Sequence, residues 1–152
     1  MAGAFVTSEL EGLEPVLRRI NALAAPRRLA QGLAHVGALI ESQTKGRFDE
    51  RRSPDGEPWA PWSPAYAKTR RKGQTLLVSS GALRDDIAWE LTEDELAVGS
   101  GLVYAAIHQA GGTDDMPAGP AAIPARPYLG LSAADAKEVD DAIAEWIEGL
   151  LH

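Results

Sequence analysis

The residue with the most suggestive chemical surroundings is His108, because Ser100, Tyr104 and an acidic pair at 114–115 lie close to it in the chain. An imidazole beside a serine can serve as the general base of a hydrolase, and beside carboxylates it can bind a metal ion. Neither arrangement has its usual spacing, since the chain contains no His-x-x-x-His, His-Glu-x-x-His or Gly-x-Ser-x-Gly. A structural hydrogen bond is therefore the favoured role of His108. A small His108-dependent hydrolase or metal enzyme stays open as an alternative function.

The other groups of ligand type are less specific. The helical pattern places His35 opposite Leu33, on the solvent side, and the chain has no cysteine for thiolate chemistry or zinc binding. A glycine pair around Ser100 lacks the third glycine of a dinucleotide-binding loop. The acidic pairs at 85–86 and 114–115 lack the spaced oxygen ligands of a calcium loop. We therefore assign no catalytic, cofactor-binding or metal-ligating residue.

A run of cations follows two tryptophans and a tyrosine. The cations are Lys68, Arg70, Arg71 and Lys72. Cations beside aromatic rings can contact phosphates and stack on bases, so a nucleic-acid-binding module using Lys68–Lys72 stays open as a second alternative. Trp59 and Trp62, however, alternate with prolines, which favours packing of their large apolar area against the protein's own core. The run is interpreted as an interface or a phosphate-steering patch.

Charge is distributed unevenly along the chain. The formal net charge of −7 argues against a protein that coats nucleic acid with its whole surface. Residues 61–84 carry five basic side chains and no acidic one, whereas residues 85–152 carry fourteen acids and two bases. Such asymmetry suits head-to-tail contacts between copies, or contacts with two unlike partners.

The length of 152 residues predicts one domain. No uncharged apolar run approaches the roughly 18–20 residues that a membrane-spanning helix needs. Residues 1–6 lack the basic segment of a secretory signal. These patterns give no reason to expect a membrane partner.

Two long amphipathic helices are predicted. The first begins at Pro26, has apolar residues at every third or fourth position, and continues toward Phe48. The second begins after Ser132, whose spacing to Asp135 is that of a capping box. Its polar face is acidic, with Glu138, Asp140, Asp141, Glu145 and Glu148. An earlier helix, ending near Ala24, makes residues 1–25 an N-terminal arm that can be separate from the rest.

Between the long helices the pattern changes to short strands and turns. Alternating apolar residues within 86–99 predict a β-hairpin. The other expected elements are a short strand at 76–78, a helical turn at 81–86, a helix at 104–109, a flexible loop at 113–122 and an extended segment at 123–129. The whole reads as an α+β domain over 1–152, with N-terminal helices, a small antiparallel sheet and a long C-terminal helix in one compact unit. The predicted core consists of Leu33, Val36, Ile40, Trp89, Val98, Ile107, Val139, Ile143 and Trp146.

Several segments, in this order, resemble the phage virion morphogenesis family, the tail-completion proteins of Mu-like phages and related prophages. The segments are KGRF at 45–48, SPDGEPW at 53–59, SGALR at 80–84, VG at 98–99, YAAIHQ at 104–109 with GG at 111–112, and IPARPYLG at 123–130. The resemblance covers roughly residues 29 to 151. Where such proteins often carry an aromatic residue before the paired glycines, this chain has Ala110, and its loop at 113–122 also differs.

The resemblance implies a structural or assembly role in a virion, at the head–tail junction or the tail end, with no known catalysis and no cofactor. The implied partners are neck, tail-tube or tail-terminator proteins and further copies of the chain, as a homo-oligomer that can be a ring. DNA would be met only during its passage and would not be bound specifically. The protein itself would be located in the tail or neck of the virion, and in the host cytoplasm during assembly. The candidate interface residues are Lys68, Arg70, Arg71, Lys72, Arg126, Tyr128, Glu138, Asp141 and Glu145.

Overall fold

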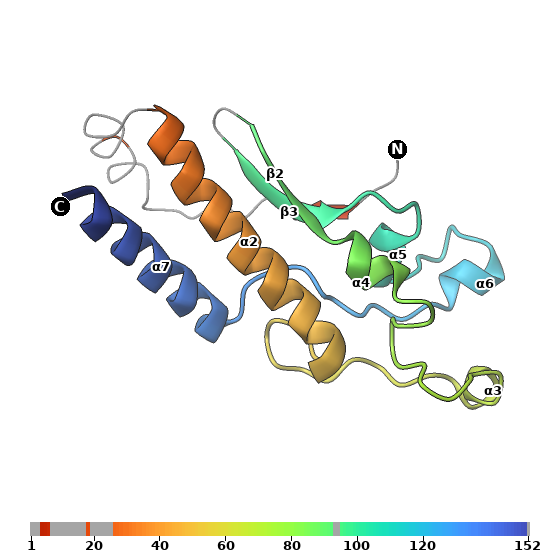
Figure 1. The fold of residues 1–152 in the computed structure, drawn as a ribbon. Helices are drawn as coiled ribbons and strands as arrows, with labels where there is room; N and C mark the ends of the chain where they lie inside the picture. The colour runs from red at the N-terminus through yellow and green to blue at the C-terminus, as the bar shows by residue number, and fades with distance from the viewer. Residues whose placement is uncertain (1–3, 7–17, 19–25, 93–94, 152) are drawn as a thin grey trace.

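A computed structural model describes residues 4–6, 18, 26–92 and 95–151 of the chain (Figure 1). Its elements, in chain order, are β1 (Ala4–Val6), α2 (Pro26–Glu50), α3 (Pro64–Ala67), α4 (Ala82–Asp86), β2 (Ala88–Leu91), β3 (Leu96–Ser100), α5 (Ala105–Ala110), α6 (Ala118–Ala121) and α7 (Ala133–Leu151). This mixture of helices and antiparallel strands confirms the predicted α+β class. The helix expected before Pro26 lies outside the described residues, apart from Arg18.

The central element is α2, which separates α7 from the sheet (Figure 1). α7 lies along one side of α2 and runs antiparallel to it, while β2 and β3 pack against another side. The short helices α3, α4, α5 and α6 gather at the end of the molecule away from α7. The apolar residues of α2 therefore pack against both α7 and the sheet. Both predicted long helices are confirmed.

Two glycines of α2 allow these neighbours to approach closely. A Cβ atom built on Gly32 would lie 2.4 Å from the Trp146 ring of α7. A Cβ atom on Gly37 would lie 2.9 Å from Trp89 of β2 and 2.9 Å from Leu96 of β3. All three distances are shorter than a carbon–carbon contact permits. The two glycines, which weaken the helix locally, are therefore sites of helix–helix and helix–sheet packing.

Within the described residues, three antiparallel strands form a sheet in the order β1-β3-β2. Trp89 stands opposite Val98 and Leu91 opposite Leu96, which confirms the predicted hairpin and its apolar face. β1 pairs with the other edge of β3, with Ala4 opposite Ser100. β1 was not predicted, because three residues are too few to show the two-residue alternation of a strand.

The core lies where the C-terminal half of α2 meets α4, β3, α5 and the segment before α7. Its buried members are Phe48, Trp59, Leu83, Ile87, Val98, Ala105, Tyr128 and Leu129. Among the predicted core residues Val36, Val98 and Val139 are buried, and the other six are partly buried. Burial of Trp59 confirms its expected packing role.

Two local predictions are wrong. Residues 76–78 do not form a strand, because Thr75 and Val78 exchange two backbone hydrogen bonds of 3.0 Å across a tight turn, with Leu77 at a φ of 60°. The apolar side chains of this turn pack against the core, which explains their pattern without a strand. The predicted loop at 113–122 contains the short helix α6.

Candidate functional site

The extended segment 126–129 crosses the molecule and is held by side chains from distant parts of the chain. The Trp59 indole N–H donates to the carbonyl of Pro127 at 2.7 Å. The Arg126 guanidinium donates to the carbonyls of Ala60 at 2.7 Å and Pro61 at 3.1 Å. These contacts join the proline-rich segment 58–64 to the segment before α7. Of these residues, Ala60, Pro61 and Arg126 line the cleft described below.

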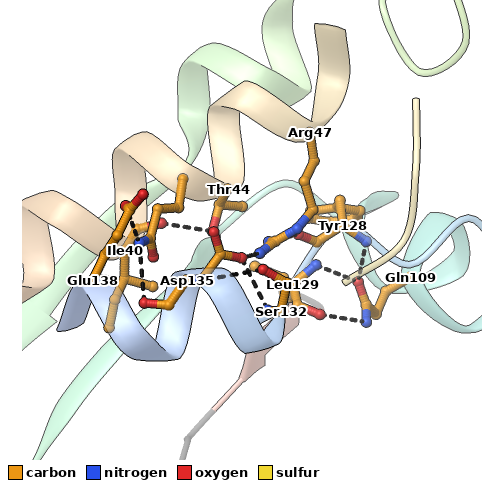
Figure 2. A network of polar contacts seen from close by, with 10 residues as sticks. Ile40, Thr44, Arg47, Gln109, Tyr128, Leu129, Ser132, Asp135 and Glu138 are labelled. Carbon is orange, nitrogen blue, oxygen red and sulfur yellow. Dashed lines mark hydrogen bonds and ion pairs between the residues drawn. The ribbon is translucent and has the colours of Figure 1, made fainter. Parts of the chain in front are cut away.

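A polar network fixes the same segment against α2 and α5 (Figure 2). Arg47 is buried and donates to the carbonyl of Tyr128 at 2.9 Å and to the carboxylate of Asp135. Gln109 of α5 accepts from the backbone N–H groups of Tyr128 and Leu129, each at 3.0 Å. The buried guanidinium is thus balanced by a carboxylate of the same chain, as burial of a charge requires.

The start of α7 is fixed by the predicted capping box. The Ser132 N–H donates to the Asp135 carboxylate at 2.9 Å, and the Asp135 N–H donates to the Ser132 hydroxyl at 3.0 Å. Gln43 of α2 donates to the carbonyl of Asp135 at 3.2 Å and to the Glu138 carboxylate at 2.9 Å. These contacts set the direction in which α7 leaves the core.

Two predicted interface residues are buried in the protomer. Tyr128 has no exposed surface, and its hydroxyl donates to the carbonyl of Ala105 at 2.9 Å. Burial, helped by the charge of Asp86, raises the pKa of Tyr128 to about 12. Arg126 is 7% exposed and donates to backbone carbonyls. The prediction of Tyr128 as a surface contact is therefore corrected, because this side chain packs inside the core, whereas Arg126 forms part of the wall of a cleft.

A cleft of about 880 Å³ lies among the short helices. Its aromatic and charged lining consists of Trp62, Tyr66, Arg70, Tyr104, His108 and Arg126. Apolar side chains such as Leu77 and Ile123 contribute further lining, and none of the described lining residues is Asp or Glu. In a chain with a net charge of −7, the cleft is thus a local surface of apolar, aromatic and basic character.

The structure divides the cationic run in two. Arg70 lines the cleft, with its guanidinium carbon 4.0 Å from the centre of the Tyr66 ring. Lys68, Arg71 and Lys72 are exposed and are not part of the cleft lining. We call these three residues the outer basic cluster. Arg70 and the outer basic cluster can therefore contact different partners.

His108 is partly buried in the cleft wall. Its ring meets that of Tyr104 edge to face, with centroids 6.1 Å apart, and its Nδ1 is buried without a hydrogen-bond partner among the described residues. Burial, helped by the nearby cation Arg126, lowers the pKa of His108 below its usual 6.5. The structural hydrogen bond favoured for His108 is not made by this nitrogen. Nor, within the described residues, does a hydrogen bond join its side chain to a serine or carboxylate.

The remaining candidate ligands have structural partners or face solvent. Asp86 accepts from the Ser100 hydroxyl at 2.6 Å and from the Gly101 N–H at 3.0 Å, joining the end of α4 to the end of β3. Asp115 accepts from Thr113, and His35 is exposed as predicted. The described residues contain no group of three side chains suited to hold a metal ion. None of their helices is long and apolar enough to cross a membrane.

The polar face of α7 is acidic, as predicted. Its exposed carboxylates belong to Glu138, Asp140, Asp141, Glu145 and Glu148. Lys137 pairs with Asp141 at 2.6 Å and is the basic residue of this helix. α7 lies at one end of the molecule, whereas α3, which leads directly into the outer basic cluster, lies at the other (Figure 1). The two predicted charged surfaces are therefore separate.

Comparison with known proteins identifies relatives over almost the whole chain. The model of the phage virion morphogenesis family matches residues 8–148. The putative capsid assembly protein G of Escherichia phage Mu is 32% identical over 151 residues, covering 96% of this chain and 95% of that protein. The Mu-like prophage FluMu G protein 2 of Haemophilus influenzae is 33% identical over 128 residues, covering 84% and 90%. No solved structure matches.

Proposed function

Because the chain belongs to the phage virion morphogenesis family, it has a structural or assembly role in a phage particle, and we propose that it acts at the head–tail junction or the tail end. In this role it is a tail-completion or connector component that works through contacts with neck, tail-tube or tail-terminator proteins and with copies of itself. It is present in the virion, and in the host cytoplasm during assembly. We propose no catalytic role.

The observation that supports this proposal is the placement of opposite charges at opposite ends of the molecule. The outer basic cluster directly follows α3 in the chain, and α7, which carries the acidic face, lies at the other end of the molecule from α3 (Figure 1). A single copy cannot bring these surfaces together. A head-to-tail contact, in which one patch meets a different patch of the next copy, brings them together and closes into a ring when the rotation allows.

The contact can be tested by reversing charge in the outer basic cluster. A variant with Arg71→Glu and Lys72→Glu should show a lower mass by light scattering than the wild-type protein, both alone and mixed with tail-tube protein. The matched control reverses Arg27 and Arg28, two adjacent exposed cations at the start of α2. An unchanged mass for the first variant, or an equal loss in both, would count against the proposed contact.

Acidic side chains that remain free in the assembly would also repel DNA during its passage. Replacing Asp140 and Glu148 by Asn and Gln removes two carboxylates while leaving the other acids of α7 in place. The assembled variant should then retain short duplex DNA at low salt, in a filter-binding measurement, more than the wild-type assembly does. Equal retention would argue against an acidic passage.

The two alternative functions each make a distinct prediction. A hydrolase or metal enzyme would lose turnover in a His108→Ala variant that still assembles, but the described residues place no hydrogen-bonded serine or carboxylate beside this ring. A nucleic-acid-binding module would bind DNA with an affinity that falls steeply with salt. Burial of Trp59 removes one of the rings that such a module would use for stacking.

A further inference from the structure

Arg126 is a buried cation that lacks an acidic partner in the described part of the chain. It is 7% exposed, and the described hydrogen bonds use two of its five N–H donors, both with backbone carbonyls. No described carboxylate lies within ion-pair distance of it, whereas the other buried guanidinium, that of Arg47, pairs with Asp135. A buried charge is ordinarily neutralised by a counter-ion, so Arg126 has capacity for an external carboxylate.

The cleft around Arg126 favours a ligand that carries an anionic group flanked by apolar groups. Arg70 provides a second cation at the cleft, held by its stacking on Tyr66, and His108 carries a buried ring nitrogen without a described partner. The walls between these groups are formed by Trp62, Leu77 and other apolar side chains. The volume of about 880 Å³ lies within the range of specific binding pockets.

The composition of the cleft is that of a protein-binding surface. Tryptophan, tyrosine and arginine are the residue types that dominate binding energy at protein–protein contacts, and the cleft presents all three. Tyr66 and Tyr104 are among the large hydrophobic side chains that stay exposed, at 49% and 44%. Exposed apolar surface of this kind marks a binding site.

We propose that this cleft binds a segment of another virion protein through an acidic side chain that pairs with Arg126 and Arg70, while apolar side chains of that segment cover the aromatic walls. This inference rests on the proposed assembly function and names the partner chemistry of one surface. The acidic face of α7 from a second copy fits less well. Its exposed side chains are carboxylates, small residues and Lys137, and they would leave Trp62 and Leu77 uncovered.

The test uses the full-length protein and peptides selected on it. A random library of displayed twelve-residue peptides is selected on the immobilised protein. The most enriched peptide is then synthesised, together with a copy in which each Asp or Glu is replaced by Asn or Gln. We expect enriched peptides to share a carboxylate beside apolar side chains. Fluorescence anisotropy should show binding about tenfold weaker for the neutral copy, the effect of one charge-assisted hydrogen bond.

A matched pair of variants locates the peptide on the protein. Arg126 is held inside the wall and its replacement can unfold the protein, so the cleft is altered at Arg70, which is only partly buried. Arg70→Gln should weaken the acidic peptide about tenfold. Arg71→Gln removes the same charge one residue away, outside the cleft, and should leave the affinity within about twofold.

Several results would overturn the proposal, including binding of a different kind of ligand in the cleft. Failure to select any peptide, selection of peptides without a carboxylate, or equal effects of the two arginine variants would all do so. Binding of a synthetic 133–151 peptide with the same dependence on Arg70 would show that a second copy is the occupant. Displacement of the selected peptide by inorganic phosphate or a short oligonucleotide would show a phosphate site.

The peptide experiment can fail independently of the proposed function. Arg70→Gln should weaken peptide binding without changing the mass of the self-assembled protein, whereas reversal of Arg71 and Lys72 should do the opposite. Peptide binding without any assembly would disprove the proposed function alone. Assembly without peptide binding would disprove the cleft proposal alone.

Discussion

Arg47 is the single residue on which the placement of α7 most depends, because its two partners lie 81 and 88 positions further along the chain. Its side chain is 4% exposed, and that of Asp135 is 19% exposed. An ion pair of this kind contributes little compared with apolar packing, but removal of one partner leaves an unbalanced buried charge. The energetic consequence therefore appears when Asp135 is changed.

Asp135→Asn keeps an oxygen that can cap α7 and removes the charge that balances Arg47. We expect the free energy of unfolding, measured by urea denaturation, to fall by about 3 kcal/mol. Asp141→Asn is the control on the same helix, because its pair with Lys137 is exposed and such pairs contribute little. Equal urea midpoints for the two variants would contradict this account of Arg47.

The pH dependence of the free energy of unfolding tests whether the Tyr128 phenol is buried. The hydroxyl of this fully buried side chain is hydrogen-bonded to Ala105, so Tyr128→Phe should lower the free energy of unfolding by about 1 kcal/mol at pH 8. The folded pKa is about 12 and the ordinary value is 10.0, so above pH 10 the phenol ionises in the unfolded chain first. Tyrosine ionisation thus removes stability from the wild type as pH rises from 10 toward 12.

The difference between wild type and Tyr128→Phe should therefore shrink between pH 8 and pH 11, because the variant lacks the ionising group. Urea denaturation of both proteins at the two pH values measures it. Other groups that titrate at high pH are common to both proteins and cancel in the comparison. A difference that stays constant would mean that the phenol is not buried as described.

At the scale of elements, α2 contains three glycines with different surroundings. Gly46 has open space where a Cβ atom would stand, whereas Gly32 would place a Cβ atom 2.4 Å from Trp146. Gly46→Ala should raise the free energy of unfolding by up to about 1 kcal/mol, the gain in helix propensity. Gly32→Ala has the same intrinsic gain but displaces α7, so we expect a net loss. Thermal unfolding of both variants measures these changes, and stabilisation by Gly32→Ala would show that α7 does not pack this closely.

The elements that the sequence predicted well are those with a repeating pattern. α2, the hairpin of β2 and β3, α5 and the capped start of α7 follow from apolar spacing and local capping, which act within a few residues. β1 was too short for such a pattern. The apolar residues of the turn at 75–78 pack against the core, and no local pattern in the sequence reveals that contact.

The candidate site could not be predicted in the same way, because its parts come together only in the fold. The bonds from Arg126 to Ala60 and Pro61 join residues 66 and 65 positions apart. Every member of the central core cluster except Ile87 lies in a segment that carries the family resemblance. Those segments therefore specify the core that the family shares, which explains why Tyr128, a core residue within one of them, was mistaken for a surface contact.

At the scale of the whole molecule, the charge pattern along the chain becomes a separation in space. The net charge of −7 would make copies repel one another at long range. A local contact between the outer basic cluster and the acidic face of α7 can overcome this repulsion at short distance, and salt would screen both. Self-association through this contact should therefore require opposite charges on the two faces that meet.

Two variants, each with the charge of one face reversed, give the strongest test of this contact. One variant carries Glu at the three positions of the outer basic cluster, so that both of its ends are acidic. A second variant carries Lys in place of Glu138, Asp141 and Glu145, so that both of its ends are basic. Neither should assemble alone, but an equimolar mixture should assemble in alternation, because every contact then joins opposite charges.

Light scattering of each variant and of the mixture measures this outcome. If the assembly is a closed ring, alternation permits only even numbers of copies, so a wild-type ring with an odd number should change its mass in the mixture. Variants that fold, as judged by circular dichroism, but fail to assemble when mixed would show that some other pair of surfaces joins the copies. Restoration in the mixture requires that these two faces meet, because no other contact changes sign in both partners.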